Sequence, residues 1–415
     1  MRKIKDSGVA WIGVIPENWQ LLSVGALFKV RNEKVNDTDY PPLSVTKGGI
    51  VPQMESVAKS DATDNRKMVL KNDFVINSRS DRKQSCGVSP LDGSVSLINT
   101  VLHPVPNAPV LPDYLDYLLK NYGFAQEFYR WGHGIVADLW TTRWQEMKNI
   151  FLPILPVEEQ QKIIFSISTQ MEKVDALIAN VQEQIEKLKA YKQSLITEVV
   201  TKGLDPNVPM KDSGVEWIGE IPVSWKTIRV KQLLRERKER SVDGKEEPLS
   251  MSQKVGLVPT KMLDMIPNMA SSFVGAKLAY VDDLVFNKLK AHLGVFSVSK
   301  YDGLVSPDYA VYYSTGIIDL KYLEYLFKTP QCISEFRKKS TGIAAGLTRL
   351  YTDDLFAIEC PMPSKDEQIE IVLFLNEKCA QIDELMSLKQ TKIEKLEQYK
   401  RSLIYEYVTG KKEVS

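Results

Sequence analysis

The sequence predicts an α+β protein with two pseudo-symmetric domains separated by two long antiparallel coiled-coil helices. Three observations lead to this fold class. A motif with two tryptophans occurs twice, the end of each half is charged and has helical periodicity, and the remaining segments mix short apolar runs with turn residues. A duplication that covers both halves of a chain also indicates a target that itself has two similar parts.

The repeated motif opens each half of the chain. Residues 5–19 read KDSGVAWIGVIPENW and residues 211–225 read KDSGVEWIGEIPVSW, an offset of 206 residues. The longest later match pairs IEKLKAYKQSLITEVVT at 185–201 with IEKLEQYKRSLIYEYVT at 393–409. Each half therefore has a tryptophan-rich lead, a variable body and a helical tail.

These parts predict four segments along the chain. They are a first domain with its lead at 1–155, a first spacer helix at 156–205, a second domain with its lead at 206–362, and a second spacer helix at 363–415.

The two tails are expected to be long helices that pair with each other. In the first tail, apolar residues recur every three or four positions from Val174 to Leu195, and in the second from Ile382 to Leu403 with one break at Lys389. Ser364 and Glu367 have the spacing of a capping box, and Gly203 ends the first tail. A stripe this narrow needs a partner, and an antiparallel pair would hold the two bodies apart as a spacer. The alternative is that the tails are bundle helices that only fill a core.

Each body is expected to contain several short strands and one helix. The apolar runs FVIN at 74–77, VSLI at 95–98 and LVFN at 284–287 predict strands, and the segments 112–130 and 318–338 each predict a helix. The two copies keep ND before FVIN and DD before LVFN, which share the aspartate, but they differ in the loop that follows. Shared framework with changed loops is typical of one scaffold that reads two different targets.

Basic side chains in these differing regions are the candidate contacts to nucleic acid. A Lys or Arg in a loop after a strand can neutralise a phosphate, or reach guanine O6 and N7 in a major groove. A second region precedes each tail, at 130–139 and 339–350. The alternative for each residue is an ordinary solvated loop. The candidates are Lys47, Arg79, Arg82, Lys83, His133 and Arg143 in the first half, and Lys254, Lys288, Lys290, His292, Lys339 and Arg349 in the second.

Composition excludes several other classes of protein. The chain has 415 residues, of which 43% are hydrophobic, and a formal net charge of +1, so its charge indicates no polyanionic partner by itself. No apolar run approaches the roughly 20 residues that cross a bilayer, and the start MRKIKDSG lacks the apolar core of a signal peptide, so we expect a cytoplasmic protein. Four widely spaced cysteines indicate neither a disulfide framework nor a zinc site.

Catalytic motifs are missing from the sequence. There is no GxxxxGK[ST] phosphate loop, and DYPP at 39–42 has its tyrosine in the wrong place for an N/D-P-P-Y/F methylase motif. Glu236 and Lys238 have the E-x-K spacing of some nucleases, but they fall in the charged run from Arg229 to Arg240, which is typical of a solvated helix face. We therefore expect a protein that recognises its target and catalyses no reaction, with no catalytic, cofactor-binding or metal-binding residue.

The whole layout resembles the specificity subunit of type I restriction-modification enzymes. The resemblance rests on the repeated KDSGVxWIGxIPxxW lead, the proline-to-glutamine start of each tail at 156–160 and 363–368, and the tail ends with SLI and VT. It implies that the bodies are target-recognition domains, each reading one half of a bipartite asymmetric DNA site, and that the paired helices set the gap between the half-sites.

The same resemblance implies the partners and cofactors. Two adenine methyltransferase subunits would dock on the specificity subunit, and restriction and translocase subunits would join them on double-stranded DNA. S-adenosylmethionine, ATP and magnesium would then belong to the partner subunits and not to this chain. Two rivals remain at this point: a scaffold that pairs two protein partners without reading DNA, and a self-sufficient nuclease that uses Glu236 and Lys238.

Overall fold

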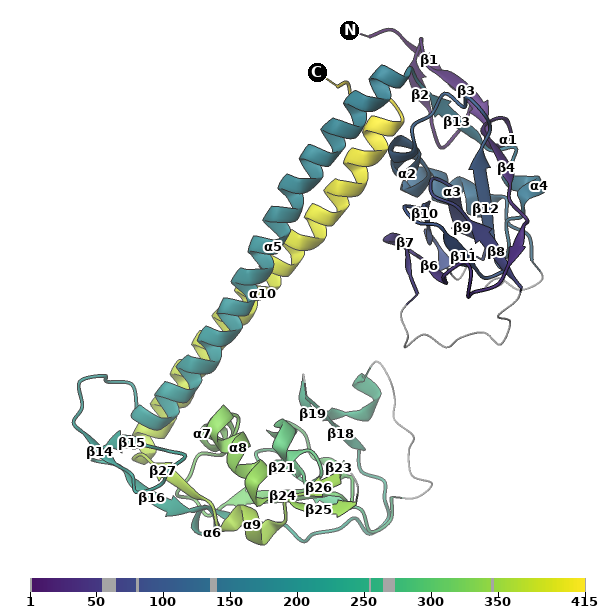
Figure 1. The fold of residues 1–415 in the computed structure, drawn as a ribbon. Coiled ribbons are helices and arrows are strands. Elements are labelled where there is room, and N and C mark those ends of the chain that lie inside the picture. The colour runs from purple at the N-terminus through teal and green to yellow at the C-terminus, as the bar shows by residue number, and fades with distance from the viewer. Residues whose placement is uncertain are drawn as a thin grey trace. The chain divides into compact units, whose positions relative to one another are not determined.

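The computed structural model describes residues 2–53, 65–79, 82–134, 140–253, 255–263, 273–344 and 347–414. The chain forms two compact units (Figure 1). The first unit comprises residues 1–182 and 390–415, and the second comprises residues 183–389. Lys254, one of the candidate residues, lies outside the described part of the chain. The division into four sequence segments stays a prediction.

The first unit is built on small antiparallel sheets flanked by helices. Its four-stranded sheet has the order β10-β9-β12-β4, and β11-β8-β5, β6-β7, β13-β3 and β1-β2 form the smaller ones. The strands are β1 Ile4–Asp6, β2 Val14–Pro16, β3 Gln20–Ser23, β4 Phe28–Val30, β5 Lys34–Val35, β6 Leu43–Thr46, β7 Gly49–Pro52, β8 Arg66–Val69, β9 Phe74–Asn77, β10 Cys86–Val88, β11 Gly93–Val95, β12 Asn99–Pro104 and β13 Phe151–Ile154. The helices are α1 Val24–Leu27, α2 Pro112–Lys120, α3 Tyr122–Arg130, α4 Trp144–Met147 and the start of α5 Val157–Lys202.

The second unit repeats this plan. Its four-stranded sheet has the order β17-β24-β21-β22, which matches the first sheet strand for strand. The strands are β14 Met210–Asp212, β15 Glu220–Pro222, β16 Lys226–Arg229, β17 Leu234–Glu236, β18 Leu249–Ser252, β19 Gly256–Pro259, β20 Lys277–Ala279, β21 Leu284–Asn287, β22 Phe296–Val298, β23 Gly303–Val305, β24 Tyr309–Ser314, β25 Thr341–Ala344, β26 Leu347–Arg349 and β27 Glu359–Met362. The helices are α6 Val230–Leu233, η2 Thr260–Met262, η3 Ala291–Leu293, α7 Leu320–Phe327, α8 Pro330–Lys339, α9 Thr352–Phe356 and α10 Lys365–Val408.

The predicted α+β class with two long antiparallel helices is confirmed. In the first unit Asp175 of α5 accepts a hydrogen bond from Lys400 of α10 at 2.5 Å. In the second unit Lys389 of α10 donates to Gln184 at 2.6 Å and Asp383 accepts from Lys192 at 2.6 Å, so the α10 numbers fall as the α5 numbers rise. The capping box at the start of α10 is also present, because the Ser364 amide donates to Glu367 at 2.9 Å and the Glu367 amide donates to Ser364 at 3.3 Å.

Each predicted body helix is in fact two helices. Asn121 separates α2 from α3, and its side chain accepts a hydrogen bond from the Phe124 amide at 3.0 Å, as an N-cap does. Thr329 separates α7 from α8 in the same way, and Pro330 starts α8. Because the residue before a proline avoids the helical conformation, a single helix over 318–338 is not possible at Thr329.

The charged run from Arg229 to Arg240 is not a solvated helix face. Only four of its residues form α6, and Leu234–Glu236 form strand β17, which pairs with β24. Arg237 lies in an ion pair with the buried Asp283, at 2.7 Å from Nε to the carboxylate. The helix-face interpretation was wrong because β-pairing with distant residues overrides local charge pattern.

Each tryptophan-rich lead packs on the beginning of one long helix and on the end of the other. In the first unit the buried Trp19 donates its indole N–H to Glu159 of α5 at 3.2 Å. In the second, Trp225 donates to Glu367 of α10 at 3.1 Å. Gly410, just after α10, lies against the Trp19 ring, and Gly203, just after α5, lies against the Trp225 ring. The lead is therefore a structural element that holds both helices to a body.

These two glycines give a matched test of that packing. Both have left-handed backbone angles, with φ of +73° at Gly410 and +80° at Gly203. A Cβ on Gly410 would lie 2.5 Å from Cδ of Pro16, whereas a Cβ on Gly203 would meet its nearest atom at 3.4 Å. We expect Gly203→Ala to lower the free energy of unfolding by about 1–2 kcal/mol, because alanine is strained in the left-handed conformation. Gly410→Ala is expected to lose the same amount plus ~1–3 kcal/mol for the clash with Pro16.

Hydrogen exchange of the peptides around Trp19 and Trp225, measured by mass spectrometry on each variant, shows which unit has lost stability. Equal losses in the two variants would contradict the packing described for Gly410.

Candidate functional site

The two candidate regions of the first unit meet at the end of α3. The first is the loop after β9, and the second is the segment that follows α3. Thr142 joins them, because its amide donates to the carbonyl of Ser78 at 3.1 Å. Thr141 also pairs in bridges with Arg79 and with His133. Arg79 and His133, which are far apart in sequence, therefore lie on the same surface.

Tyr129 of α3 contacts residues 82–84 of the loop. Its hydroxyl donates to the carbonyl of Arg82 at 3.3 Å and accepts from the amide of Gln84 at 3.1 Å. The ammonium of Lys83 lies 5.9 Å from the centre of the Tyr129 ring, a cation–π distance. The side chains of Arg82 and Lys83 are both exposed.

Arg143 completes this group. It is exposed and precedes α4, one residue after Thr142. We call the group of Arg79, Arg82, Lys83, His133 and Arg143 the first basic surface. Lys47 lies elsewhere, in the turn of the β6-β7 hairpin, where Lys120 donates to the neighbouring carbonyl of Gly48 at 3.2 Å.

The two candidate regions of the second unit meet in the same way. The amide of Leu350 donates to the carbonyl of Lys288, in the loop after β21, at 3.0 Å. Thr341, in the first strand of the β25-β26 hairpin, pairs with Arg349. Nδ1 of His292 lies 3.4 Å from Oγ1 of Thr348 in the second strand, within hydrogen-bonding distance. The hairpin and the loop thus form one surface.

We call Lys288, Lys290, His292, Lys339 and Arg349 the second basic surface. Lys290 and Lys339 are exposed, and Lys339 is the last residue of α8, two residues before the hairpin begins. Lys288 and His292 are half-buried. Burial lowers the pKa of the neighbouring Lys277, and the charge of Lys288 lowers it further, so the two ammonium groups are close enough to repel each other.

Arg349 differs from the other members because its charge is already paired. Its Nη2 lies 2.7 Å from the carboxylate of Asp308, and its buried Nε has no hydrogen-bond partner in the described part of the chain. A guanidinium held by one carboxylate is less available to a phosphate than Lys290 or Lys339. The sequence could not indicate this pairing, because Asp308 is 41 residues away from Arg349.

Several backbone features of the two surfaces correspond although the side chains differ. The bridge His133–Thr141 and the pair Thr341–Arg349 occupy corresponding positions of the repeat. The loops after β9 and β21 have the same number of residues, and each ends near a left-handed residue, Gln84 with φ of 63° or a glycine with φ of 74°. Equivalent scaffolds therefore carry different basic side chains.

A buried ion pair supports each scaffold at an equivalent place. Arg31 donates to Asp73 at 2.7 Å through Nε, and Arg237 donates to Asp283 at 2.7 Å through the same atom. Both aspartates lie directly before the central strands β9 and β21, whose ends lead into the basic loops. The hydrogen bond to Asp283 raises the pKa of Arg237, which burial alone would lower, so the guanidinium stays charged. Comparison of the two halves showed that these aspartates are shared, but it did not indicate their pairing with Arg31 and Arg237.

Glu236 of the E-x-K motif has a structural contact. It accepts a hydrogen bond from Oγ1 of Thr352 at 3.1 Å, and the same hydroxyl lies 3.0 Å from that of Tyr312. In the part of the chain that the structure describes, no three His, Cys, Asp or Glu side chains are grouped as metal ligands would be. In the same residues, no helix is both long and apolar enough to span a membrane.

Comparisons with known proteins identify similar chains. No protein-family model matches this chain. A protein named as the putative type I restriction enzyme MjaX specificity subunit of Methanocaldococcus jannaschii is 23% identical over 429 aligned residues, which cover 96% of this chain and 95% of that protein. The type I restriction enzyme MjaVIII specificity subunit of the same organism is 23% identical over 64% of this chain and 62% of its own length.

Two solved structures share the fold along almost the whole chain. One, from a study of the assembly and conformational transition of the type I restriction-modification system, has a TM-score of 0.67 and 15% identity and covers 95% of this chain and 98% of its own. The other, the HsdS subunit from Thermoanaerobacter tengcongensis, has a TM-score of 0.52 and 15% identity and covers 98% and 99%. The resemblance to type I specificity subunits that the motifs indicated is therefore confirmed.

Proposed function

We propose that this chain is the DNA-recognition subunit of a type I restriction-modification complex and reads a bipartite, asymmetric DNA site. The observation that carries the proposal is the pair of equivalent scaffolds with different basic residues. The first basic surface carries Arg79 and His133, where the second carries a leucine and a threonine, and Arg349 replaces Thr141. A duplicated scaffold that only bound partners would not need two different basic loops.

Each basic surface would contact one half-site. Exposed Arg and Lys side chains bind phosphates, which positions the protein, and some of them would read base edges in the major groove. Because the formal net charge is only +1, binding by the chain alone would be weak and salt-sensitive, and partner subunits would add phosphate contacts. The paired helices α5 and α10 would set the gap between the half-sites.

The chain itself would not catalyse a reaction. Two adenine methyltransferase subunits would dock on it, and restriction and translocase subunits would join the complex in the cytoplasm. S-adenosylmethionine, ATP and magnesium would bind to those partners. One of the similar structures comes from work on assembly of the type I system, which supports the expectation of partner subunits.

The rival proposal is a scaffold that pairs two partner proteins without reading DNA. The two repeated leads and helices fit that role equally well, since they are similar in both halves. The different loops do not fit it. The two proposals therefore make different predictions about a chain in which one body is exchanged.

The test is to co-express the chain with candidate methyltransferase subunits and to map methylated adenines in genomic DNA. We expect a split motif with a fixed gap. Exchanging residues 20–155 for the same segment of a relative is then expected to change one half of the motif and to leave the other half and the gap unchanged. Exchanging residues 226–362 is the matched control, and it is expected to change only the other half. A motif unaffected by both exchanges would support the scaffold and contradict DNA reading.

A further inference from the structure

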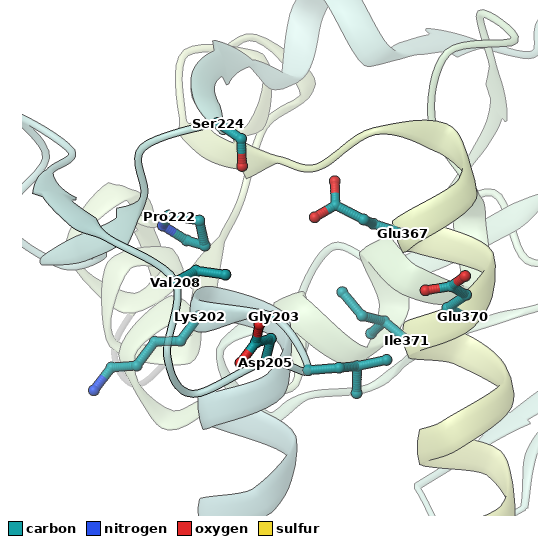
Figure 2. Close-up of a pocket in the computed structure, with 10 residues that line it drawn as sticks. Lys202, Gly203, Asp205, Val208, Pro222, Ser224, Glu367, Glu370 and Ile371 are labelled. Atoms are coloured by element: carbon teal, nitrogen blue, oxygen red, sulfur yellow. The ribbon is translucent and has the colours of Figure 1, made fainter.

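The second unit has a cavity between the end of α5 and the start of α10. Its volume is about 140 Å³, and it is lined by Lys202, Gly203, Leu204, Asp205, Val208, Pro222, Ser224, Glu367, Glu370 and Ile371. Figure 2 shows the hydroxyl of Ser224 and the carboxylate of Glu367 facing the same space, while the ammonium of Lys202 points away from it. The Glu367 carboxylate accepts hydrogen bonds and the Ser224 hydroxyl can accept one, and the carboxylates of Asp205 and Glu370 also line the cavity.

The corresponding place in the first unit is filled by an arginine of the chain itself. Nη2 of Arg2 lies 2.5 Å from a carboxylate oxygen of Glu159 and donates to Oδ1 of Asn18 at 3.0 Å. The centre of its guanidinium lies 5.4 Å from the centre of the Trp19 ring. Arg2 is therefore held by an ion pair, a side-chain hydrogen bond and an aromatic contact.

In the second unit the position equivalent to Arg2 is not an arginine. The positions equivalent to its hydrogen-bond and ion-pair partners still carry side chains that can accept hydrogen bonds. Glu367 corresponds to Glu159, since each accepts the indole N–H of the lead tryptophan. By the offset of the lead, Ser224 corresponds to Asn18, and Val208 corresponds to Arg2. The cavity lies where Val208 is too short to follow the arginine side chain.

The backbone around the two places supports this correspondence. In the first unit Lys5 donates its ammonium to the carbonyl of Glu17 at 2.8 Å, and in the second Lys211 donates to the carbonyl of Val223 at 2.8 Å. The strand pairs β1-β2 and β14-β15 have the same register. Arg2 and Val208, each two residues before its strand pair, therefore start from the same position relative to the lead tryptophan.

The charges at the rim differ between the units in the direction that favours a cation. Glu370 and Asp205 line the cavity of the second unit, whereas the position equivalent to Glu370 in the first unit is Lys162. Burial acts to raise the pKa of Glu367, but hydrogen bonds from Ser364 and Trp225 outweigh it and lower that pKa, so its carboxylate is ionised at neutral pH. A guanidinium would thus meet one partly buried carboxylate and two exposed ones.

We propose that this cavity is a docking site for an arginine side chain of a partner polypeptide, which would occupy the place that Arg2 takes in the first unit. The guanidinium would pair with Glu367 and donate to Ser224, and Glu370 would attract it from the rim. The site would make the two otherwise similar units unequal, because only the second would accept the partner's arginine. This inference goes beyond the proposed function and does not depend on DNA reading.

The test uses the full-length chain labelled with fluorotryptophan and follows the fluorine resonances of Trp19 and Trp225. The probe is N-acetyl-arginine amide, which imitates an arginine within a polypeptide. We expect a saturable shift of the Trp225 resonance at millimolar probe, with no shift of Trp19, because Arg2 occupies the equivalent site. Absence of a saturable Trp225 shift would overturn the proposal.

Two reciprocal variants control for the site. Val208→Arg places the arginine of the first unit into the second, and it is expected to weaken probe binding at least ~10-fold by filling the cavity. Arg2→Val empties the first site, and Trp19 is then expected to respond as well. Both variants are expected to fold, because each residue already occupies the equivalent position of the other unit. An unchanged Trp225 response in Val208→Arg would contradict the assigned site.

Three further arms define the chemistry of the occupant. N-acetyl-lysine amide should bind more weakly, because an ammonium lacks the planar set of N–H donors with which a guanidinium can bind two acceptors at once. Free arginine should also bind more weakly, because its carboxylate would be repelled by Glu370 and Asp205. Glu370→Lys, which copies Lys162, should weaken binding of the capped arginine. Equal or tighter binding of free arginine would contradict a polypeptide partner and favour a free metabolite as the ligand. Equal binding of N-acetyl-lysine amide would contradict the requirement for a guanidinium.

Discussion

Replacing Arg79, Arg82 and Lys83 together by glutamine is expected to weaken binding of the assembled complex to its DNA site by about 100-fold. This value assumes about fivefold for each side chain, the low end for specific contacts. The same variant should reduce the slope of log K against log salt by up to ~2.7, which is about 0.9 for each phosphate that the protein no longer neutralises. All three residues belong to the first basic surface and are exposed.

The physical reason is that these charges are held in place before DNA arrives. Residues 82–84 are anchored to Tyr129 through the carbonyl of Arg82 and the amide of Gln84, so the backbone of this segment is positioned on folding. A preorganised contact loses less entropy on binding than a flexible one. Loss of these charges should therefore weaken binding more than loss of equal charge from other surfaces.

A matched control removes the same net charge from elsewhere in the same unit. Lys29, Lys34 and Lys71 are exposed and lie outside the basic surface, and their joint replacement by glutamine is expected to leave affinity and salt slope nearly unchanged. Binding is measured by fluorescence anisotropy over a range of salt concentrations. An equal loss in both triple variants would show a general charge effect and contradict the assigned surface.

Replacing Arg237 by alanine is expected to destabilise the second unit by about 3–5 kcal/mol, the cost of leaving a buried charge without its partner. Asp283 is only 2% exposed, and its two carboxylate oxygens accept from Nε and Nη2 of Arg237 at 2.7 and 2.8 Å. The guanidinium also lies 4.7 Å from the ring centre of Tyr280 and 5.0 Å from that of Tyr313. Alanine can restore neither the bidentate hydrogen bonds nor these ring contacts.

Two controls separate the loss of the partner from the loss of the side chain. The double variant Arg237→Met with Asp283→Leu removes both charges, and it is expected to cost much less than Arg237→Ala alone. Arg229→Ala breaks an exposed ion pair with Glu359 in the same unit and is expected to cost less than about 1 kcal/mol.

The loss of stability in each variant is measured by urea unfolding, together with hydrogen exchange at β17 and β21. If Arg237→Ala cost no more than Arg229→Ala, the ion pair would not support the scaffold.

Arg237 also shows how far local pattern could predict this structure. Its sequence context, a run of basic residues, favours a solvated helix face, yet the residue is a partner of Asp283 at a distance of 46 positions. The basic candidates in the loops came from direct comparison of the two copies of the repeat, which differ there, and their contacts to DNA stay a prediction. Which of them are available depends on contacts such as Arg349–Asp308, which no local pattern indicates.

The amino-acid sequence by itself determined the duplication, the two long helices with their caps, the central strands β9 and β21, and the loops in which the copies differ. These features depend on local periodicity, capping and direct comparison of the two halves. Tertiary structure alone decided that the two basic regions of each unit meet and that each lead holds the end of the other half's helix. It also left Glu367 facing a cavity where Glu159 binds Arg2. Those outcomes depend on contacts between residues far apart in the chain, whose free energy is gained only when the whole unit folds.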